Sequence, residues 1–170
     1  MIIPAKVANF NVYDDKTKLL GVSGEITLPN LESMTSTVSG AGILGELETP
    51  NVGHFGSMSI EIPWRSLLDK TFNFAAYAGR SLSLRGAVQQ VDSNTAALSY
   101  YQVKITIKYM SKGLDLGKLS LNSTMESKNT LEVFYIKVEI NGKTTLELDK
   151  LNSVYKVNGV DQLSAINKLI

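Results

Sequence analysis

Stretches that alternate apolar and polar residues constrain the fold of this chain more than any other feature. The alternation occupies residues 20–28, 58–62, 82–88, 103–109 and 131–140. Successive side chains of a β-strand point to opposite faces, so this period of two is typical of strands with one buried face. In the last stretch the phase slips between Val133 and Phe134, and either a β-bulge or a strand covered on both faces would account for the slip. The pattern predicts a mainly β fold, either a β-sandwich or a β-barrel.

Two further segments predict short helices. Residues 64–77 place Trp64 and several other apolar side chains near one helical face, and residues 162–170 follow Asp161, a favourable N-cap residue. Hairpin turns are indicated by Asn141-Gly142 and Asn158-Gly159, because Asn-Gly readily adopts the positive φ angles of a tight hairpin.

The composition indicates one globular domain over residues 1–170. Hydrophobic residues make up 44% of the chain and the net charge is +1, so no overall basic field is available to attract nucleic acid or an anionic membrane. There is no apolar run of membrane-spanning length, and residues 1–6 lack the features of a signal peptide. We therefore expect synthesis in the host cytoplasm.

Residue usage argues against most enzyme classes. The chain has no cysteine and a single histidine, so thiol nucleophiles, thiolate metal sites and multi-histidine metal sites are excluded. His54 lies in a Gly-rich region and is interpreted as a polar loop residue. The carboxylate pairs Glu46/Glu48 and Glu147/Asp149 have a spacing common on any solvated strand. We expect no catalytic activity, no metal and no cofactor.

Residues 28–57 are predicted to contain a long loop. This region contains Pro29, Pro50 and several glycines, and much of it lacks sustained alternation. Loops of this length in compact domains are usually functional or disordered. Its stretch Gly40-Ala41-Gly42-Ile43-Leu44-Gly45-Glu46 is not a phosphate loop, because it lacks the Gly-Lys-Ser/Thr ending and continues into acidic residues.

Charge is distributed unevenly along the chain. Between Lys18 and Arg65 there is no basic residue but five glutamates, whereas residues 65–112 contain seven basic residues and two acidic ones. A solvated surface would explain each block singly. The alternative is head-to-tail assembly, in which the acidic segment of one subunit meets basic surface on the next.

Several strings together resemble the major tail tube proteins of contractile-tailed phages and phage-tail-like bacteriocins. The resemblance covers nearly the whole chain and is weakest at residues 92–98. The strings that carry it are Ile26-Thr27-Leu28-Pro29, Gly40 to Glu46, Glu48-Thr49-Pro50, Glu61-Ile62-Pro63-Trp64-Arg65, Leu84-Arg85-Gly86-Ala87, Leu116-Gly117-Lys118-Leu119 and Leu148 to Asp161.

The resemblance implies a structural role. Members of that family form hexameric rings that stack into the hollow tube inside a contractile sheath, with a long loop that reaches the neighbouring ring. By this resemblance, residues 33–57 are expected to be that long interaction loop. The implied partners are further copies of the chain, the sheath protein, a baseplate or initiator complex and a tape measure protein. DNA would be only non-specific cargo. The implied location is the virion tail or a bacteriocin particle.

Residue roles also follow from the resemblance. Inter-ring or inter-subunit contact is assigned to Gly40, Gly42, Gly45, Glu46 and Glu48. The residues that match the family strings and are expected to be structural are Trp64, Arg65, Asp149, Asn152, Asn158, Gly159 and Asp161. Glu25 and Glu61, on the polar sides of alternating stretches, are candidates for the lumen wall, where negative charge would repel phosphate.

Two other interpretations remain open from sequence alone. One is a ring-forming tube or effector carrier of a contractile secretion system. The other is a monomeric β-barrel binding protein whose strands enclose a small-molecule cavity. Rings or stacked tubes distinguish the first from the second.

Overall fold

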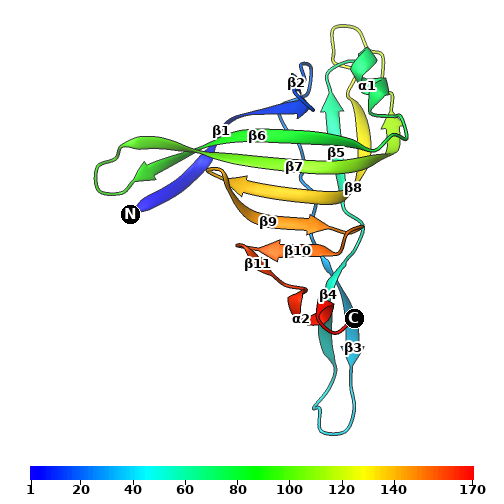
Figure 1. Cartoon of the computed structure of the whole chain (residues 1–170). Helices are drawn as coiled ribbons and strands as arrows, with labels where there is room; N and C mark the ends of the chain where they lie inside the picture. Colours follow the sequence, from blue (N-terminus) through cyan, green and yellow to red (C-terminus); the bar gives the residue numbers. More distant parts are fainter.

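The computed structural model describes residues 1–170 and consists mainly of antiparallel β-strands (Figure 1). The strands are β1 (Ile2–Asp14), β2 (Thr17–Lys18), β3 (Ser33–Val38), β4 (Leu47–Phe55), β5 (Ser59–Trp64), β6 (Arg80–Asp92), β7 (Leu98–Asp115), β8 (Ser127–Ile140), β9 (Lys143–Asp149), β10 (Val154–Val157) and β11 (Val160–Asp161). The helices are α1 (Asp69–Asn73) and α2 (Ser164–Asn167). The prediction of a mainly β fold with one or two short helices is confirmed.

One sheet contains nine of the strands and folds over itself at β8. Its order is β11-β10-β9-β8-β7-β6-β1-β2, and β5 pairs with the first half of β8. Opposite Lys108 and Tyr109 of β7 stand Tyr135 and Val133 of β8, so Phe134 is an extra residue in the ladder. A bulge of this kind bends and twists a strand. The predicted phase slip is therefore a β-bulge, and it lies between the segments of β8 that pair with β5 and with β9.

The core lies between the broad sheet and the layer that contains β5. Leu82 of β6 stands opposite Ile107 of β7, and both are fully buried. Trp64, Phe74 and Tyr109 form an aromatic row, with ring centroids 5.8 Å apart at each step. The strands predicted at residues 58–62, 82–88 and 103–109 are confirmed, with their apolar side chains facing this core.

The strand predicted at residues 20–28 is wrong. This segment is extended, but its only ladder contact is a single bridge between Val22 and Trp64. It passes behind the sheet between β2 and β3, and Val22 and Ile26 pack against the core (Figure 1). Two backbone hydrogen bonds flank this bridge: the Ser23 amide donates to the Pro63 carbonyl at 3.0 Å, and the Arg65 amide donates to the Gly21 carbonyl at 2.9 Å. Beyond them the segment has no ladder, so its apolar spacing mainly reflects contact with a sheet face that the chain crosses.

Both predicted helices are much shorter than expected. Residues 63 and 64 belong to β5, and α1 begins only at Asp69. Pro63 is tolerated there because β5 lies at an edge and its N–H is not needed for the ladder. At the C-terminal side, Asp161 precedes a single helical turn whose N-cap is Leu163. Among the apolar residues of that segment, Leu163 is buried, whereas Leu169 and Ile170 are almost fully exposed.

The tight turns agree with the sequence. Asn141 and Gly142 have φ angles of 49° and 78° between β8 and β9, and Asn158 and Gly159 have angles of 50° and 81° between β10 and β11. Positive φ at both central residues is the requirement of a type I′ hairpin turn.

Candidate functional site

The region predicted as a long loop is a two-stranded β-hairpin that projects from the body. We call residues 33–57 the arm; β3 and β4 form its two strands and pair only with each other (Figure 1). Residues 41–48 at and beside its tip are all exposed. An isolated two-stranded ribbon is at best marginally stable in water. The arm therefore depends on its base, on an external partner, or on both.

Apolar side chains at the tip of the arm lie outside the hydrophobic core of the chain. Leu44 is 107% exposed, and Ile43 and Leu47 are also exposed. Gly42 and Gly45 bracket Ile43 and Leu44 with φ angles of 88° and 111°, which L side chains rarely adopt. The turn thus holds two aliphatic side chains out into solvent, where apolar groups usually mark an interaction site.

The base of the arm is held to the body by polar contacts. Ser57 Oγ donates to Glu132 Oε2 at 2.7 Å, and the Met58 amide donates to Oε1 at 3.3 Å. Lys112 Nζ lies 3.4 Å from Glu132 Oε2. Burial of this carboxyl opposes its ionisation, but the hydrogen bond from Ser57 and the charge of Lys112 outweigh that effect, so the pKa of Glu132 lies below its usual value. Lys150 Nζ also donates to the Gly56 carbonyl at 2.6 Å.

Apolar contacts hold the same base on the side of β10 and α2. The rings of Phe55 and Tyr155 meet edge to face, with centroids 5.0 Å apart. Gly53 has a φ of 79°, and a Cβ there would lie 2.6 Å from Leu163 Cδ2. Sequence analysis missed Glu132, Lys150, Tyr155 and Leu163, because their contacts with the arm join residues far apart in the chain.

The residues matched to the family strings build the tight C-terminal turns and part of the core. Asp149 accepts hydrogen bonds from the amides of Leu151 and Asn152 at 3.0 Å each and from Asn152 Nδ2 at 2.7 Å. Asp161 Oδ1 accepts from the Leu163 amide at 2.9 Å. Trp64 is buried, whereas Arg65 is exposed at the end of β5.

The two acidic lumen candidates lie in the same layer, behind the broad sheet. Glu25 is exposed and lines an apolar groove of about 560 Å³ between the segment 24–28 and the inner face of β1, β6 and β7. Glu61 is exposed on β5, and its Oε1 lies 3.0 Å from Lys128 Nζ. Thus Glu61 is neutralised within the subunit, while Glu25 has no ion-pair partner.

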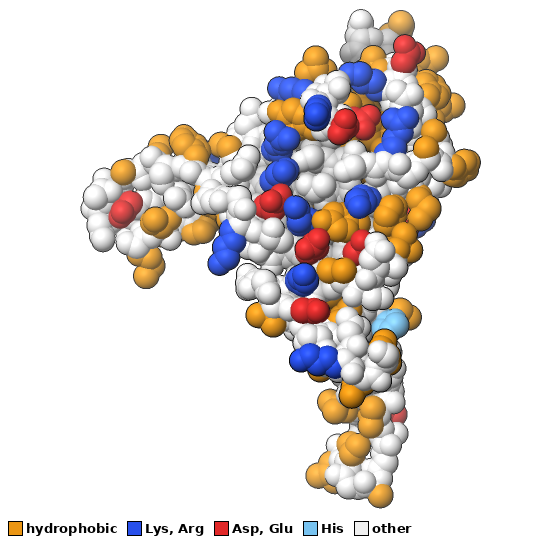
Figure 2. Space-filling view, viewed as in Figure 1, with side chains coloured by type: hydrophobic (Ala, Val, Ile, Leu, Met, Phe, Trp, Pro, Cys, Tyr) orange, Lys and Arg blue, Asp and Glu red, His pale blue; other side chains and the backbone are white.

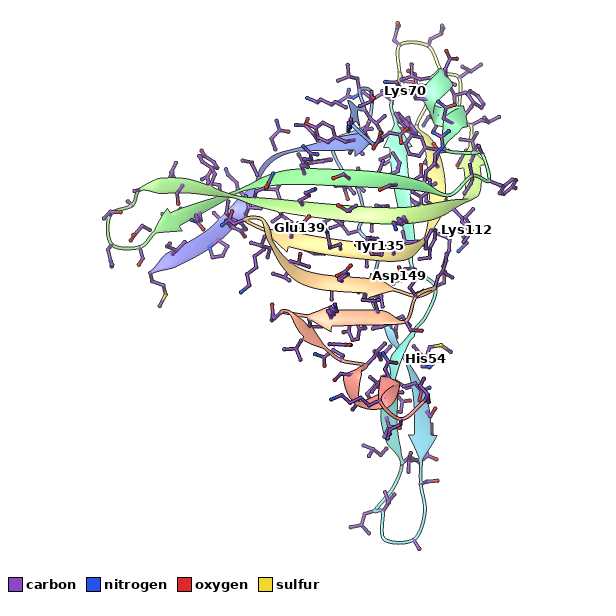
Figure 3. All side chains as sticks on the ribbon, in the orientation of Figure 1. His54, Lys70, Lys112, Tyr135, Glu139 and Asp149 are labelled. Atoms are coloured by element: carbon purple, nitrogen blue, oxygen red, sulfur yellow. The ribbon has the colours of Figure 1, made fainter.

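His54 lies on β4 and is exposed, so the single histidine belongs to a strand of the arm and not to a loop (Figure 3). No group of three or more histidine, aspartate or glutamate side chains is arranged to hold a metal ion. Neither helix has the length or apolar character needed to span a bilayer.

We call the seven basic residues of the segment 65–112 the basic block. Most of them form ion pairs or cation–π contacts within the subunit. Arg80 pairs with Asp14 at 3.6 Å, Lys104 with Glu139 at 3.5 Å, and Lys112 with Glu132. Arg85 and Lys108 instead lie over the rings of Tyr13 and Tyr135.

Arg65 and Lys70 are the two members of the block without an acidic or aromatic partner. On the arm, Glu46 and Glu48 are likewise unpaired.

The subunit exposes far more surface than a compact monomer of its mass. Its accessible surface is 10931 Å², about a third more than the roughly 8,200 Å² expected for a compact 18.5 kDa protein. Besides the arm, the molecule has a second projection, formed by the start of β1 and the far end of the β6–β7 hairpin around residues 92–98 (Figure 1). Hydrophobic side chains gather on both projections and at the upper end of the molecule (Figure 2). Only 23 of 170 residues are buried, so this geometry suits a subunit whose projections are covered by neighbours.

Comparison with known proteins gives consistent matches. Residues 4–170 match the family described as phage tail tube protein FII. The tail tube protein of Escherichia phage P2 is 26% identical over 167 residues, covering 96% of this chain and 95% of the relative. The major tail tube protein of Serratia phage KSP20 is 26% identical over 159 residues, covering 94% and 91%.

Two solved structures share the fold. Both are cryo-EM structures of an extracellular contractile injection system in the extended state. The PVC sheath-tube complex contains a chain that matches with a TM-score of 0.55 and 11% identity, over 80% of this chain and 91% of that one. The PVC sheath/tube terminator gives a TM-score of 0.54 and 12% identity, over 81% and 97%.

Proposed function

Because the chain belongs to the phage tail tube protein FII family and is therefore a structural protein of a phage-type tail tube, we propose that it forms hexameric rings that stack into the inner tube of a contractile tail. The observation that carries this proposal is the family match over residues 4–170, together with a fold shared with contractile injection system tubes. The large exposed surface and the projecting arm support it independently, since both need neighbours to cover them.

The proposed mechanism is mechanical. Contraction of a surrounding sheath drives the tube, as a rigid piston, through the envelope of a target cell. In a phage the lumen then conducts DNA, which is held by no specific contact. The subunit needs no catalysis for either task. Beyond its own copies and the sheath protein, the proposed partners are a baseplate or initiator complex that starts the tube and a tape measure protein inside it.

We also propose that Glu25 and Glu61 face the lumen, where negative charge would keep DNA phosphates from adhering. The unpaired carboxylate of Glu25 supports this role more strongly than Glu61, which is paired with Lys128. The other surface broad enough to line a channel is the outer face of the sheet, where Glu139 lies between Lys104 and Lys137. A reconstruction of the tube with that face toward the axis would overturn the assignment of Glu25 and Glu61.

A second candidate is the tube of a contractile secretion or injection system, favoured by the fold shared with the PVC sheath-tube complex. The relatives from phages P2 and KSP20 are more similar in sequence, at 26% against 11% identity, so a phage-type tail ranks first. Isolation of the particle that contains the chain decides between them: a capsid or a free bacteriocin tail supports the first, and an injection particle loaded with effector supports the second.

Negative-stain electron microscopy of the purified protein at low and high concentration tests the central proposal. Uniform rings or stacked tubes are expected at high concentration. Particles of monomer size at every concentration, including after addition of tail tube fragments as seeds, would overturn it in favour of a monomeric binding protein.

A further inference from the structure

A second surface with exposed apolar side chains and unpaired charges lies at the end of the molecule opposite the arm. We define the cap as residues 65–79 and 116–126, which include α1 and the connection from β7 to β8 (Figure 1). Backbone hydrogen bonds join its parts: the Met125 amide donates to the Arg65 carbonyl and the Lys118 amide donates to the Met125 carbonyl, both at 2.8 Å. The cap and the arm therefore mark the two ends of one subunit.

The cap exposes an unusual number of apolar side chains. Leu119 and Leu121 are 89% and 95% exposed, Tyr77 is 92% exposed, and Phe72 and Leu116 are about half exposed. The chain leaves Leu119, Leu121 and Tyr77 almost completely uncovered and covers only about half of Phe72 and Leu116. A patch of this kind, on a subunit with a large surplus of surface, is the expected character of a contact between copies.

The charges at the two ends are complementary. Arg65 and Lys70, the two cations of the basic block without an acidic or aromatic partner, both lie on the cap, and Figure 3 shows Lys70 at this end of the molecule. The unpaired carboxylates of Glu46 and Glu48 lie on the arm beside Ile43 and Leu44. The cap also carries the exposed carboxylate of Asp69, which has no ion-pair partner, so the unpaired charges of Arg65, Lys70 and Asp69 sum to +1. Those of Glu46 and Glu48 on the arm sum to −2, so the two ends combine exposed aliphatic groups with unpaired charges of opposite net sign.

We propose that the arm tip, residues 43–48, docks on the cap of a second copy of this chain in the adjacent ring. Ile43 and Leu44 would pack among Phe72, Leu119 and Leu121, while Glu46 and Glu48 would approach Arg65 and Lys70. The inference rests on the proposed tube function and deepens it, because it identifies the receiving surface for the arm. A contact between opposite ends of the same molecule is heterologous and propagates along a line.

Disulfide trapping tests this contact directly, because the natural chain contains no cysteine and all thiols are introduced ones. There are two test variants, and each carries both of its cysteines in the same polypeptide. One combines Leu44→Cys with Leu119→Cys, and the other combines Leu44→Cys with Leu121→Cys. Leu44→Cys with Leu98→Cys is the matched control, since Leu98 is exposed on a different projection. Protein assembled as for electron microscopy is oxidised and separated on a non-reducing gel.

The expected result is a ladder of covalent trimers, tetramers and longer species from at least one test pair, collapsing to monomer on reduction. Each single variant stops at the dimer, because one thiol per chain cannot extend a ladder. If tubes are seen but neither test pair gives a ladder, the arm docks elsewhere: this inference is overturned and the tube function stands. If the wild-type chain forms neither rings nor tubes under seeded conditions, the proposed function fails and the inference fails with it.

Discussion

The indole Nε1 of Trp64 donates a hydrogen bond of 2.8 Å to Oδ1 of Asn129, and both side chains are almost completely buried. Asn129 Nδ2 then donates to the carbonyl of Thr71 at 3.1 Å. One amide therefore links the end of β5, the start of β8 and helix α1 inside the core. Because the cap is built on these three elements, its placement depends on this amide.

Replacing Asn129 with leucine should destabilise the subunit by about 2 to 6 kcal/mol. The leucine keeps most of the volume but leaves the Trp64 N–H and the Thr71 carbonyl buried without partners, and each such group costs about 1 to 3 kcal/mol. Urea denaturation of the unassembled protein, followed by Trp64 fluorescence, measures the loss. Asn30→Ala, at an exposed position, is the control and should change the free energy of unfolding by less than about 0.5 kcal/mol. Equal stability of the two variants would contradict the structural role of Asn129.

The acid dependence of stability should come partly from Asp149. Burial opposes ionisation of this carboxyl, but the hydrogen bonds from Asn152 and Leu151 and the charge of Lys108 hold its pKa below the usual 3.8. The folded state thus binds fewer protons here than the unfolded state. The stabilisation is present above about pH 4 and is lost as pH falls through the lowered pKa.

Asp149→Asn should therefore be less stable than wild type near neutral pH, with a shallower loss of stability below about pH 4. Denaturation curves at a series of pH values measure both effects. Glu132, whose pKa is also lowered, remains in the variant. The slope of the free energy of unfolding against pH should therefore become smaller but not reach zero. Parallel stability curves for the two proteins would show that Asp149 makes no contribution.

Much of the broad sheet could be predicted from sequence, because one face of each strand is buried. In Leu82 to Val88 and Val103 to Tyr109, apolar residues recur at every second position because only one face of each strand packs on the core. The Asn-Gly dipeptides correctly predict the turns at 141 and 158. Even the bulge at Phe134 was visible as a slip in phase.

The arm and the helices could not be predicted in the same way. β3 is exposed along almost its whole length, and β4 is half-buried only at positions 49, 51, 53 and 55. Because these four positions hold Thr, Asn, Gly and Phe, burial imposes no alternation of apolar residues, and the sequence predicted a loop. Conversely, residues 20–28 alternate because they cross a sheet face. Trp64 matched a helical spacing with Leu67 and Phe72 by coincidence, since Trp64 is buried in the core while Phe72 is exposed.

The contacts that hold the base of the arm could not be predicted from the sequence either. Ser57 and Glu132 are 75 residues apart in the chain, and no local pattern signals a hydrogen bond between them. The interaction role of residues 40–48 came from composition, charge and family resemblance, and it remains a prediction that the crosslinking experiment tests.

Gly117→Ala should disrupt the cap. Gly117 has a φ of 76°, and a Cβ at this position would collide with the carbonyl oxygen of Met125, a backbone atom that cannot rotate away. The substitution should shift the 116–126 connection and raise its amide hydrogen exchange. Its minimum cost is about 1 to 2 kcal/mol from the left-handed backbone alone. Gly79→Ala is the matched control, because nothing lies within 4 Å of a Cβ there. Normal exchange in the Gly117→Ala cap would contradict the steric argument.

Tube formation should weaken as salt concentration rises. Glu46 and Glu48 are unpaired in the isolated subunit, so their attraction to cations of a neighbour would be screened over a Debye length of about 8 Å at physiological ionic strength. Sedimentation of assembled protein across a salt series measures this. The double variant Glu46→Gln with Glu48→Gln should assemble less well at low salt and lose most of the salt dependence. If the wild-type chain assembles equally at low and high salt, charge does not guide the contact.

The final prediction separates assembly from folding at the arm tip. Ile43→Ser with Leu44→Ser should leave the free energy of unfolding of the monomer within about 0.5 kcal/mol of wild type, because Leu44 is fully exposed and Ile43, 41% exposed, does not pack against the hydrophobic core. Burying one such aliphatic side chain in a contact stabilises it by about 1.5 to 3 kcal/mol, and each 1.4 kcal/mol corresponds to a tenfold change in affinity. The variant should therefore need at least a tenfold higher concentration to form tubes, measured by sedimentation and electron microscopy. Leu98→Ser, which removes an exposed aliphatic group from the other projection, tests whether any loss of surface apolarity has this effect. Equal weakening by both changes would assign the result to general surface character and not to the arm tip.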